Sequence, residues 1–255
     1  MDALSQREIR EIDGVGTPER QWLAWTALSR TLPLDLSSRS FPGSRLVVVA
    51  PHPDDEVLGC GGLIRLHVQR GGHVLVVAVT DGEASHVGSS RWDRASLSAA
   101  RRAESELGLA RLVDRPIAVM RLGLPDGDVR ANARSVERSL ERVLRPADVV
   151  ATTWRCDGHP DHEAIGETTA FTCQAIGCRL MEAPVWMWHW AHPADSRVPW
   201  GRLRALRLPG DAVAAKVSAL AAHVTQLSPR ENDEGPVLDL SIQARARRST
   251  EYYFI

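Results

Sequence analysis

The chain carries two clusters of histidine and aspartate side chains, whose members are His52, Asp54, Asp55, His159 and His162. The first cluster follows the apolar run 46–50, and the second follows the apolar run 148–153. Both runs are typical of buried strands. Open α/β sheets bind ligands at the carboxyl ends of their strands, so the two clusters could converge on one metal ion.

Catalytic zinc usually has three protein ligands and keeps one position open for water. His52, Asp55 and His162 fit that count, since the first two share a strand-to-helix turn and the third opens another helix. A bound ion lowers the pKa of water towards neutrality, and Asp54 is the candidate general base. His159, as an imidazolium, could stabilise an oxyanion or protonate a leaving amine. Such ligands suit Zn²⁺, but Fe²⁺ binds similar sets.

Each cluster alone also has a purely structural interpretation, because Asp54 or Asp161 could simply cap the following helix. The glycine-rich stretch 59–62 resembles a loose phosphate loop. It lacks both the GxGxxG pattern and a Lys-Ser/Thr ending, and the two preceding carboxylates would repel phosphate. We therefore interpret these glycines as allowing a helix to pack closely on a strand.

Apolar runs alternate with helical patterns along most of the chain. We predict strands at 45–50, 73–80, 117–121, 147–153 and 184–190, and helices near 56–70, 93–108, 131–145, 161–176 and 211–226. Near-continuous apolar strands that alternate with helices indicate an α/β fold, with a Rossmann-like, mostly parallel sheet and helices on both faces. We expect residues 1–43 to form an N-terminal extension that packs on a main domain, 44–255.

Composition argues against several classes of partner. Lys and Arg total 31 and Asp and Glu total 32, so no basic field indicates nucleic acid or an anionic membrane. No apolar run is long enough to span a bilayer, and the start lacks a signal-peptide pattern. The four cysteines show no CxxC spacing, which favours reduced thiols in a cytoplasmic protein. The sequence leaves a homo-oligomer open.

Three motifs resemble the PIG-L/LmbE family of zinc-dependent N-deacetylases. They are the stretches 52–62, 80–83 and 159–162, and the similarity covers roughly residues 44–192. The resemblance implies the same site as the residue types do, with ligands His52, Asp55 and His162, general base Asp54, and His159 as acid or stabiliser of the tetrahedral intermediate. Some members carry a tyrosine two residues before His159, where this chain has Asp157.

Three further residues are candidate substrate contacts. Asp126 resembles a family aspartate that contacts sugar hydroxyls, although its Pro-Asp-Gly context also suits a plain turn. Arg91 resembles a substrate-binding arginine of some members, or is a solvated surface residue. Tryptophans alternate along 184–190 and could stack on a sugar or pack under a helix. We place Trp188 or His189 near the pocket mouth as a hypothesis.

The sequence therefore predicts a metal-dependent N-deacetylase that hydrolyses the acetamide of an N-acetylglucosamine-type sugar, in a small molecule or glycoconjugate, and releases acetate. One alternative is a zinc amidase that acts on a non-sugar N-acyl substrate. Another is a binding protein that kept the fold, and the complete set of histidines and aspartates argues against it.

Overall fold

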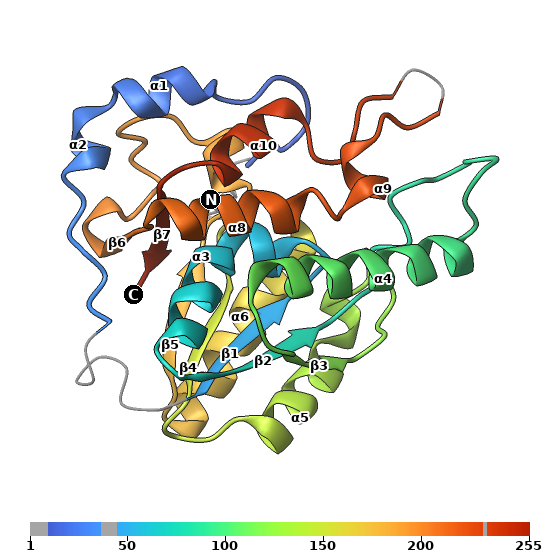
Figure 1. The fold of residues 1–255 in the computed structure, drawn as a ribbon, viewed down its shortest axis with the longest axis horizontal. Coiled ribbons are helices and arrows are strands. Elements are labelled where there is room, and N and C mark those ends of the chain that lie inside the picture. The colour runs from blue at the N-terminus through green and yellow to red at the C-terminus, as the bar shows by residue number, and fades with distance from the viewer. Residues whose placement is uncertain (1–9, 37–44, 232–233) are drawn as a thin grey trace, which may run out of the picture.

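A computed structural model describes residues 10–36, 45–231 and 234–255, and its centre is a seven-stranded sheet (Figure 1). The strands are β1 (Arg45–Ala50), β2 (His73–Ala78), β3 (Ala118–Arg121), β4 (Val149–Thr153), β5 (Arg179–Ala183), β6 (Leu203–Arg207) and β7 (Thr250–Phe254). Their order is β3-β2-β1-β4-β5-β7-β6. Strands β1 to β5 run parallel, whereas β7 is antiparallel to β5 and β6. The predicted mostly parallel α/β fold is confirmed.

Helices cover both faces of this sheet (Figure 1). They are α1 (Glu19–Ala24), α2 (Thr26–Ser29), α3 (Asp55–Gln69), α4 (Arg94–Leu112), α5 (Ala133–Val143), α6 (Pro160–Ile176), α7 (Met187–Trp190), α8 (Gly210–Leu220), α9 (Val224–Leu227) and α10 (Leu240–Ala246), with short 3-10 turns at Arg130–Asn132 and Trp200–Arg202. Helices α3, α4, α8 and α10 pack in one apolar core, and α5 and α6 pack in the other.

Strand β1 explains why the sheet strands read as continuous apolar runs. Leu46 and Val48 belong to the core under α3 and α8, whereas Val47 and Val49 belong to the core under α5 and α6. Because successive side chains of a strand point to opposite faces, a strand covered on both sides must be apolar at every position.

The described part of the N-terminal segment packs on C-terminal elements. Trp22 of α1 is fully buried, and its indole N–H donates to the Trp188 carbonyl at 3.0 Å. Pro33 forms a parallel bridge with Ala205 of β6. The predicted division at residues 43 and 44 stays a prediction, and residues 1–9 and 37–44 lie outside the described part of the chain.

The predicted strand at 184–190 is wrong, since β5 ends at Ala183 and Met187–Trp190 forms α7. The Asp157 carboxylate accepts the three successive backbone N–H groups of 185–187, at 2.9, 2.9 and 3.0 Å. Three amides that point at one acceptor are incompatible with an extended strand. The alternate tryptophans therefore do not share a strand face.

A buried ion pair ties α3 to the C-terminal strand. Lys216 and Glu251 are 2% and 5% exposed, and their charged atoms are 2.6 Å apart. Glu251 also accepts the backbone N–H groups of Gly62 and Leu63, at 2.7 and 2.9 Å. The Lys216 ammonium donates to the Leu58 carbonyl at 2.8 Å. Helix α3, which begins at Asp55 of the first histidine–aspartate cluster, is thus held from β7 and α8.

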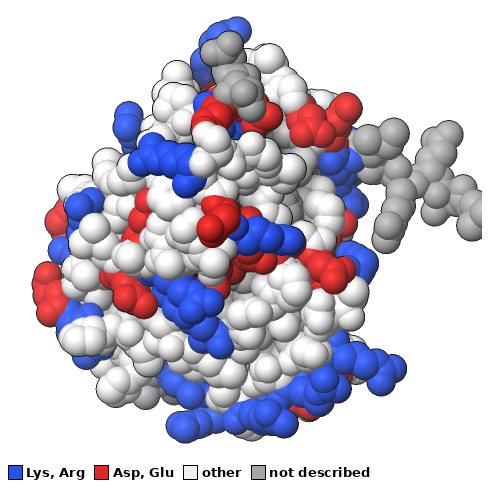
Figure 2. All heavy atoms as spheres, turned by 90° about the vertical axis from the view of Figure 1, so that its right-hand side faces the viewer, with Lys and Arg blue, Asp and Glu red and all other residues white. Residues whose placement is uncertain are grey.

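No helix in the described ranges combines the length and the hydropathy that a membrane span needs. On the face drawn in Figure 2, acidic and basic side chains are interspersed among uncharged ones. The absence of a nucleic-acid partner stays a prediction.

We expect Lys216→Met to lower the free energy of unfolding by about 3–5 kcal/mol, because it leaves the Glu251 carboxylate buried without its cation. Urea unfolding of the metal-free protein measures this loss. Adding Glu251→Gln should recover part of it, since the uncompensated charge is then removed. Arg134→Met, at an exposed arginine of α5, is the control, and an equal loss there would contradict the expectation.

Candidate active site

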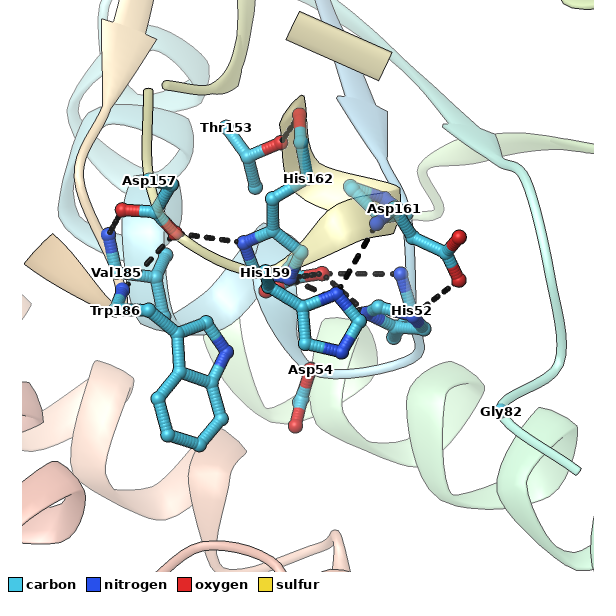
Figure 3. A network of polar contacts seen from close by, with 12 residues as sticks. His52, Asp54, Gly82, Thr153, Asp157, His159, Asp161, His162, Val185 and Trp186 are labelled. Atoms are coloured by element: carbon cyan, nitrogen blue, oxygen red, sulfur yellow. Dashed lines mark hydrogen bonds and ion pairs between the residues drawn. The ribbon is translucent and has the colours of Figure 1, made fainter. Parts of the chain in front are cut away.

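The two clusters meet beside the point at which the order of the strands in the sheet reverses. The chain runs outward from β1 to β2 and β3, then returns to β4, which pairs with the other side of β1. Open α/β sheets bind ligands at the carboxyl ends of strands beside such a switch point. The loops after β1 and β4 carry the two clusters, and Figure 3 shows that their side chains point toward one another.

Three side-chain atoms form a nearly equilateral triangle. The Asp55 Oδ2 atom lies 3.3 Å from His52 Nδ1 and 3.2 Å from His162 Nε2. The two nitrogens are 3.3 Å apart. A tetrahedral ion with bonds of about 2.0–2.1 Å separates its ligands by about 3.3–3.4 Å. The two imidazoles and the carboxylate therefore fit a zinc-sized divalent cation.

The other nitrogen of His52 faces two more carboxylates. Its Nε2 atom is 3.3 Å from Asp126 Oδ1 and 3.3 Å from Asp161 Oδ2. Asp161 is itself held by the backbone N–H groups of Gly127 and Val129, at 2.9 and 3.3 Å. Carboxylates on the far nitrogen of a ligating histidine fix the orientation of its ring and raise its basicity. This arrangement directs Nδ1 of His52 toward Asp55.

Two other triads also have ligand atoms within 4.8 Å of one another, namely His52 with His159 and His162, and His52 with Asp126 and Asp161. In the described part of the chain, only Asp55 contacts both His52 and His162 with one oxygen. The Asp55 pKa is lowered: burial alone would raise it, but His162 and His52 outweigh that effect. We therefore consider the set that contains Asp55 the best candidate for a metal site.

Asp157 is a site residue that the sequence reasoning missed. Its fully buried carboxylate lies 2.8 Å from His162 Nδ1 and, through the three amides of 185–187, holds the turn before α7. The sequence feature that could have identified Asp157 is its position two residues before His159, where some family members carry a tyrosine. Asp157 orients His162 as Asp126 and Asp161 orient His52.

Asp54 lies beside the triangle and lines the same cavity. Its backbone φ is +140°, a conformation that is costly for any residue with a Cβ. Its N–H donates to the Glu56 carboxylate at 3.0 Å. Burial and the adjacent Asp55 charge raise the Asp54 pKa well above its usual range. A buried carboxyl with a raised pKa in a cleft is the property expected of a proton carrier.

His159 precedes α6, and its surroundings favour a neutral ring over an imidazolium. Its Nδ1 accepts the Asp161 backbone N–H at 3.2 Å, so the ring proton lies on Nε2. Burial and the neighbouring imidazoles of His162 and His52 lower the pKa of His159 to about 3. A bound cation would act in the same direction. The neutral ring can still donate a hydrogen bond from Nε2.

These groups line a cavity of about 260 Å³. Its lining residues are His52, Asp54, Asp55, Leu58, Ala84, Ser85, Arg101, Asp126, Gly127, His159, His162, Val185, Trp186, Gln226, Val237, Leu238 and Ile242. The lining combines polar and charged groups with aliphatic side chains and the Trp186 indole. The cavity is thus large enough for a small polar ring with an apolar neighbour.

Of the three predicted substrate contacts, only Asp126 lines this cavity. Burial would raise its pKa, but its contact with His52 holds it at about 2. Arg91 is exposed, with its guanidinium 5.3 Å from the centre of the Trp92 ring. His189 is buried beneath the cavity wall, 5.8 Å from the Trp186 ring.

Arg101 of α4, which the sequence analysis did not propose as a site residue, is buried and lines the cavity. It donates to the Gly82 carbonyl at 2.7 Å and to the Ser85 hydroxyl at 2.8 Å. The sequence alone did not indicate that Arg101 is buried. Arg101 and Arg102 are consecutive, and only one of them can face inward from the helix.

The chain is similar to known proteins over these same elements. The family model "PIG-L: GlcNAc-PI de-N-acetylase" matches residues 47–173, from β1 to α6. A relative from Mycolicibacterium vanbaalenii, named 1D-myo-inositol 2-acetamido-2-deoxy-alpha-D-glucopyranoside deacetylase, is 30% identical, over 83% of this chain and 90% of its own length. A relative of the same name from Mycobacterium sp. (strain KMS) is 29% identical, over 78% and 79%.

Among solved structures, a deacetylase of the teicoplanin biosynthesis pathway shares the fold, with a TM-score of 0.61 and 19% identity over 82% of this chain and 96% of its own. The matched residues include both histidine–aspartate clusters, and the fold agrees over most of the chain. This protein belongs to the PIG-L family of N-acetylglucosamine de-N-acetylases.

Proposed function

We propose that this protein is a metal-dependent N-deacetylase that hydrolyses the acetamide of an N-acetylglucosamine-type sugar, in a small molecule or glycoconjugate, and releases acetate. The observation that carries the proposal is the triangle of His52, Asp55 and His162, with separations of 3.2–3.3 Å, beside the buried carboxyl of Asp54. The deacetylase names of the relatives support the same reaction class.

We propose Zn²⁺ as the metal, held by His52, Asp55 and His162, with Fe²⁺ as the alternative. When bound, the ion polarises the acetamide carbonyl and makes a water molecule more acidic. Asp157 holds His162 from behind, and its hydrogen bonds to 185–187 keep the carboxylate from turning away.

The protein residues then move protons and stabilise charge. Asp54 takes a proton from the attacking water, whose oxygen adds to the acetamide carbon. His159 donates a hydrogen bond from Nε2 to the oxygen that gains negative charge. The proton on Asp54 passes to the nitrogen as the C–N bond breaks, which leaves acetate and a free amine. A neutral His159 suits this role because it need not lose a proton.

The cavity supports a sugar substrate but also keeps the alternative open. Asp126 and Arg101 offer polar contacts to hydroxyl groups, and the Trp186 indole offers a flat face to a ring. Neither Arg91 nor His189 lines the cavity. Their roles as substrate contacts stay predictions. The aliphatic wall of Leu58, Val185 and Ile242 favours the second candidate, an amidase for a non-sugar N-acyl group.

We further propose that the enzyme acts in the cytoplasm, which its four unpaired cysteines support. Burial raises the pKa of the Cys60 and Cys156 thiols, so they stay protonated and unreactive at neutral pH. A homo-oligomer stays a prediction.

We expect purified enzyme to release acetate from N-acetylglucosamine derivatives, and Asp54→Asn to lower kcat/KM by about 10²- to 10⁴-fold, because it removes the general base. Acetate release from a panel that also contains non-sugar acetamides measures both activity and substrate class. Unchanged activity in Asp54→Asn would contradict the assigned base. Release only from non-sugar amides would favour the second candidate.

We expect chelation to abolish acetate release, and one equivalent of Zn²⁺ to restore it, because three ligands leave the metal site open to exchange. Anaerobic reconstitution with Zn²⁺ or Fe²⁺, in parallel, identifies the active metal. Activity with Fe²⁺ alone would sink the zinc assignment. Full activity in the metal-free protein would remove the metal from the reaction.

We expect Asp157→Asn to weaken metal binding by about 10- to 100-fold, because an amide cannot hold His162 and the three backbone N–H groups as a carboxylate does. Competition with a chromophoric chelator measures the affinity. The matched control is Asp195→Asn, a buried aspartate that pairs with Arg197 outside the cavity. Equal weakening in both variants would indicate a general loss of structure.

A further inference from the structure

The side chain of Gln226 reaches the candidate base from the C-terminal part of the chain. Gln226 lies in α9, is 1% exposed, and donates from Nε2 to Oδ2 of Asp54. It stands outside the residues 47–173 that match the family model. We propose that Gln226 is a positioning residue, which fixes the carboxylate of Asp54 for proton transfer. This inference rests on the proposed role of Asp54 as general base.

The hydrogen bonds around Gln226 run in one direction. Its NH₂ group donates to Oδ2 of Asp54, which accepts, as the carboxylate of a general base does. The amide oxygen then faces Nδ1 of His223, at 3.2 Å, and His223 must donate from that atom. Its Nε2 atom has no partner within the described ranges, as expected for the unprotonated nitrogen of a neutral ring. A directed chain thus runs from His223 through Gln226 to Asp54.

The amide is anchored independently of Asp54. Glu104 of α4 accepts the backbone N–H and the hydroxyl of Thr225, at 2.8 and 2.7 Å. The Gln226 carbonyl accepts the Leu238 N–H at 2.9 Å. His223 packs so tightly on Gly108 that an added Cβ would lie 3.0 Å from its Nε2 atom. Because α4 and the segment at Leu238 both hold the donor in place, it can impose a position on the acceptor.

The consequence for Asp54 is a carboxylate with one oxygen held and the other left for water. The backbone N–H of Asp54 is fixed by Glu56, and its strained φ of +140° leaves the local chain little freedom. A base that is already oriented needs no reorganisation when the substrate arrives. Gln226 also lines the cavity, but its amide oxygen and one N–H are already engaged by His223 and Asp54.

The first test is Gln226→Met, which keeps the length of the side chain and removes the amide. We expect kcat to fall about tenfold or more, as part of the roughly 10²- to 10⁴-fold contribution of a general base. We expect KM and metal affinity to stay within about twofold, because neither substrate nor metal contacts are changed. A rise in KM at constant kcat would make Gln226 a substrate contact and overturn the proposal.

A double-mutant cycle with Asp54→Asn separates positioning from general destabilisation. If Gln226 acts through Asp54, Gln226→Met should have little further effect on the residual kcat of the Asp54→Asn enzyme. The same loss in both backgrounds would overturn the proposal. Failure of the proposed function looks different, because the unmodified enzyme would then release no acetate, whereas full activity of Asp54→Asn alone would remove Asp54 as the base.

Two further variants guard against a folding defect. Gln226→Glu keeps the side-chain shape and the acceptor for His223, but sets a carboxylate against Asp54, so we expect it to lose kcat as Gln226→Met does. Val224→Ala shortens an exposed side chain of α9 and leaves the contacts of Gln226 intact. We expect its kcat to be unchanged. A loss equal to that of Gln226→Met would mean that any loosening of α9 suffices, which overturns a specific role for the amide.

Discussion

The direct pairing of β1 with β4 is the constraint on which the site depends. These strands are neighbours in the sheet although β2 and β3 lie between them in the sequence, and their register pairs Val49 with Thr152. The loop after β1 leads to α3 on one face of the sheet, and the loop after β4 leads to α6 on the other face. The two loops therefore lie side by side. A shift of the register would separate the imidazoles of His52 and His162, which now lie 3.3 Å apart.

The pairing brings together more charge than a buried site tolerates without compensation. Asp54, Asp55, Asp126, Asp157 and Asp161 lie around three imidazoles. Each carboxylate except Asp54 is matched by an imidazole or by backbone N–H groups, and such contacts lower the pKa of Asp55, Asp126 and Asp161. Asp54 receives a neutral amide instead. In the proposed reaction, the site would thereby distinguish the groups that hold a cation from Asp54, the group that exchanges a proton.

The sequence predicted the fold class and the residues that meet at the site, because strand periodicity and the position of polar residues at strand ends are local signals. It failed where tertiary contacts decide. The turn at 185–187 depends on Asp157, which is distant in sequence, so the expected strand was wrong. Arg101 and Gln226 line the cavity, although each lies in a stretch of sequence that is typical of a surface helix. Strand β6 was missed because its partner, β7, lies far along the chain.

The insertion of β7 between β5 and β6 has a consequence for the order of folding. Among the described strands, β6 pairs with β7 alone, so it cannot join the sheet until the later strand has arrived. Such non-local pairing forms slowly, and the last elements to form are commonly the first to open in the native state. Glu251, which holds α3 by two amides, is carried by that strand. Transient opening of the sheet edge would therefore loosen the helix that begins at Asp55, far from the edge itself.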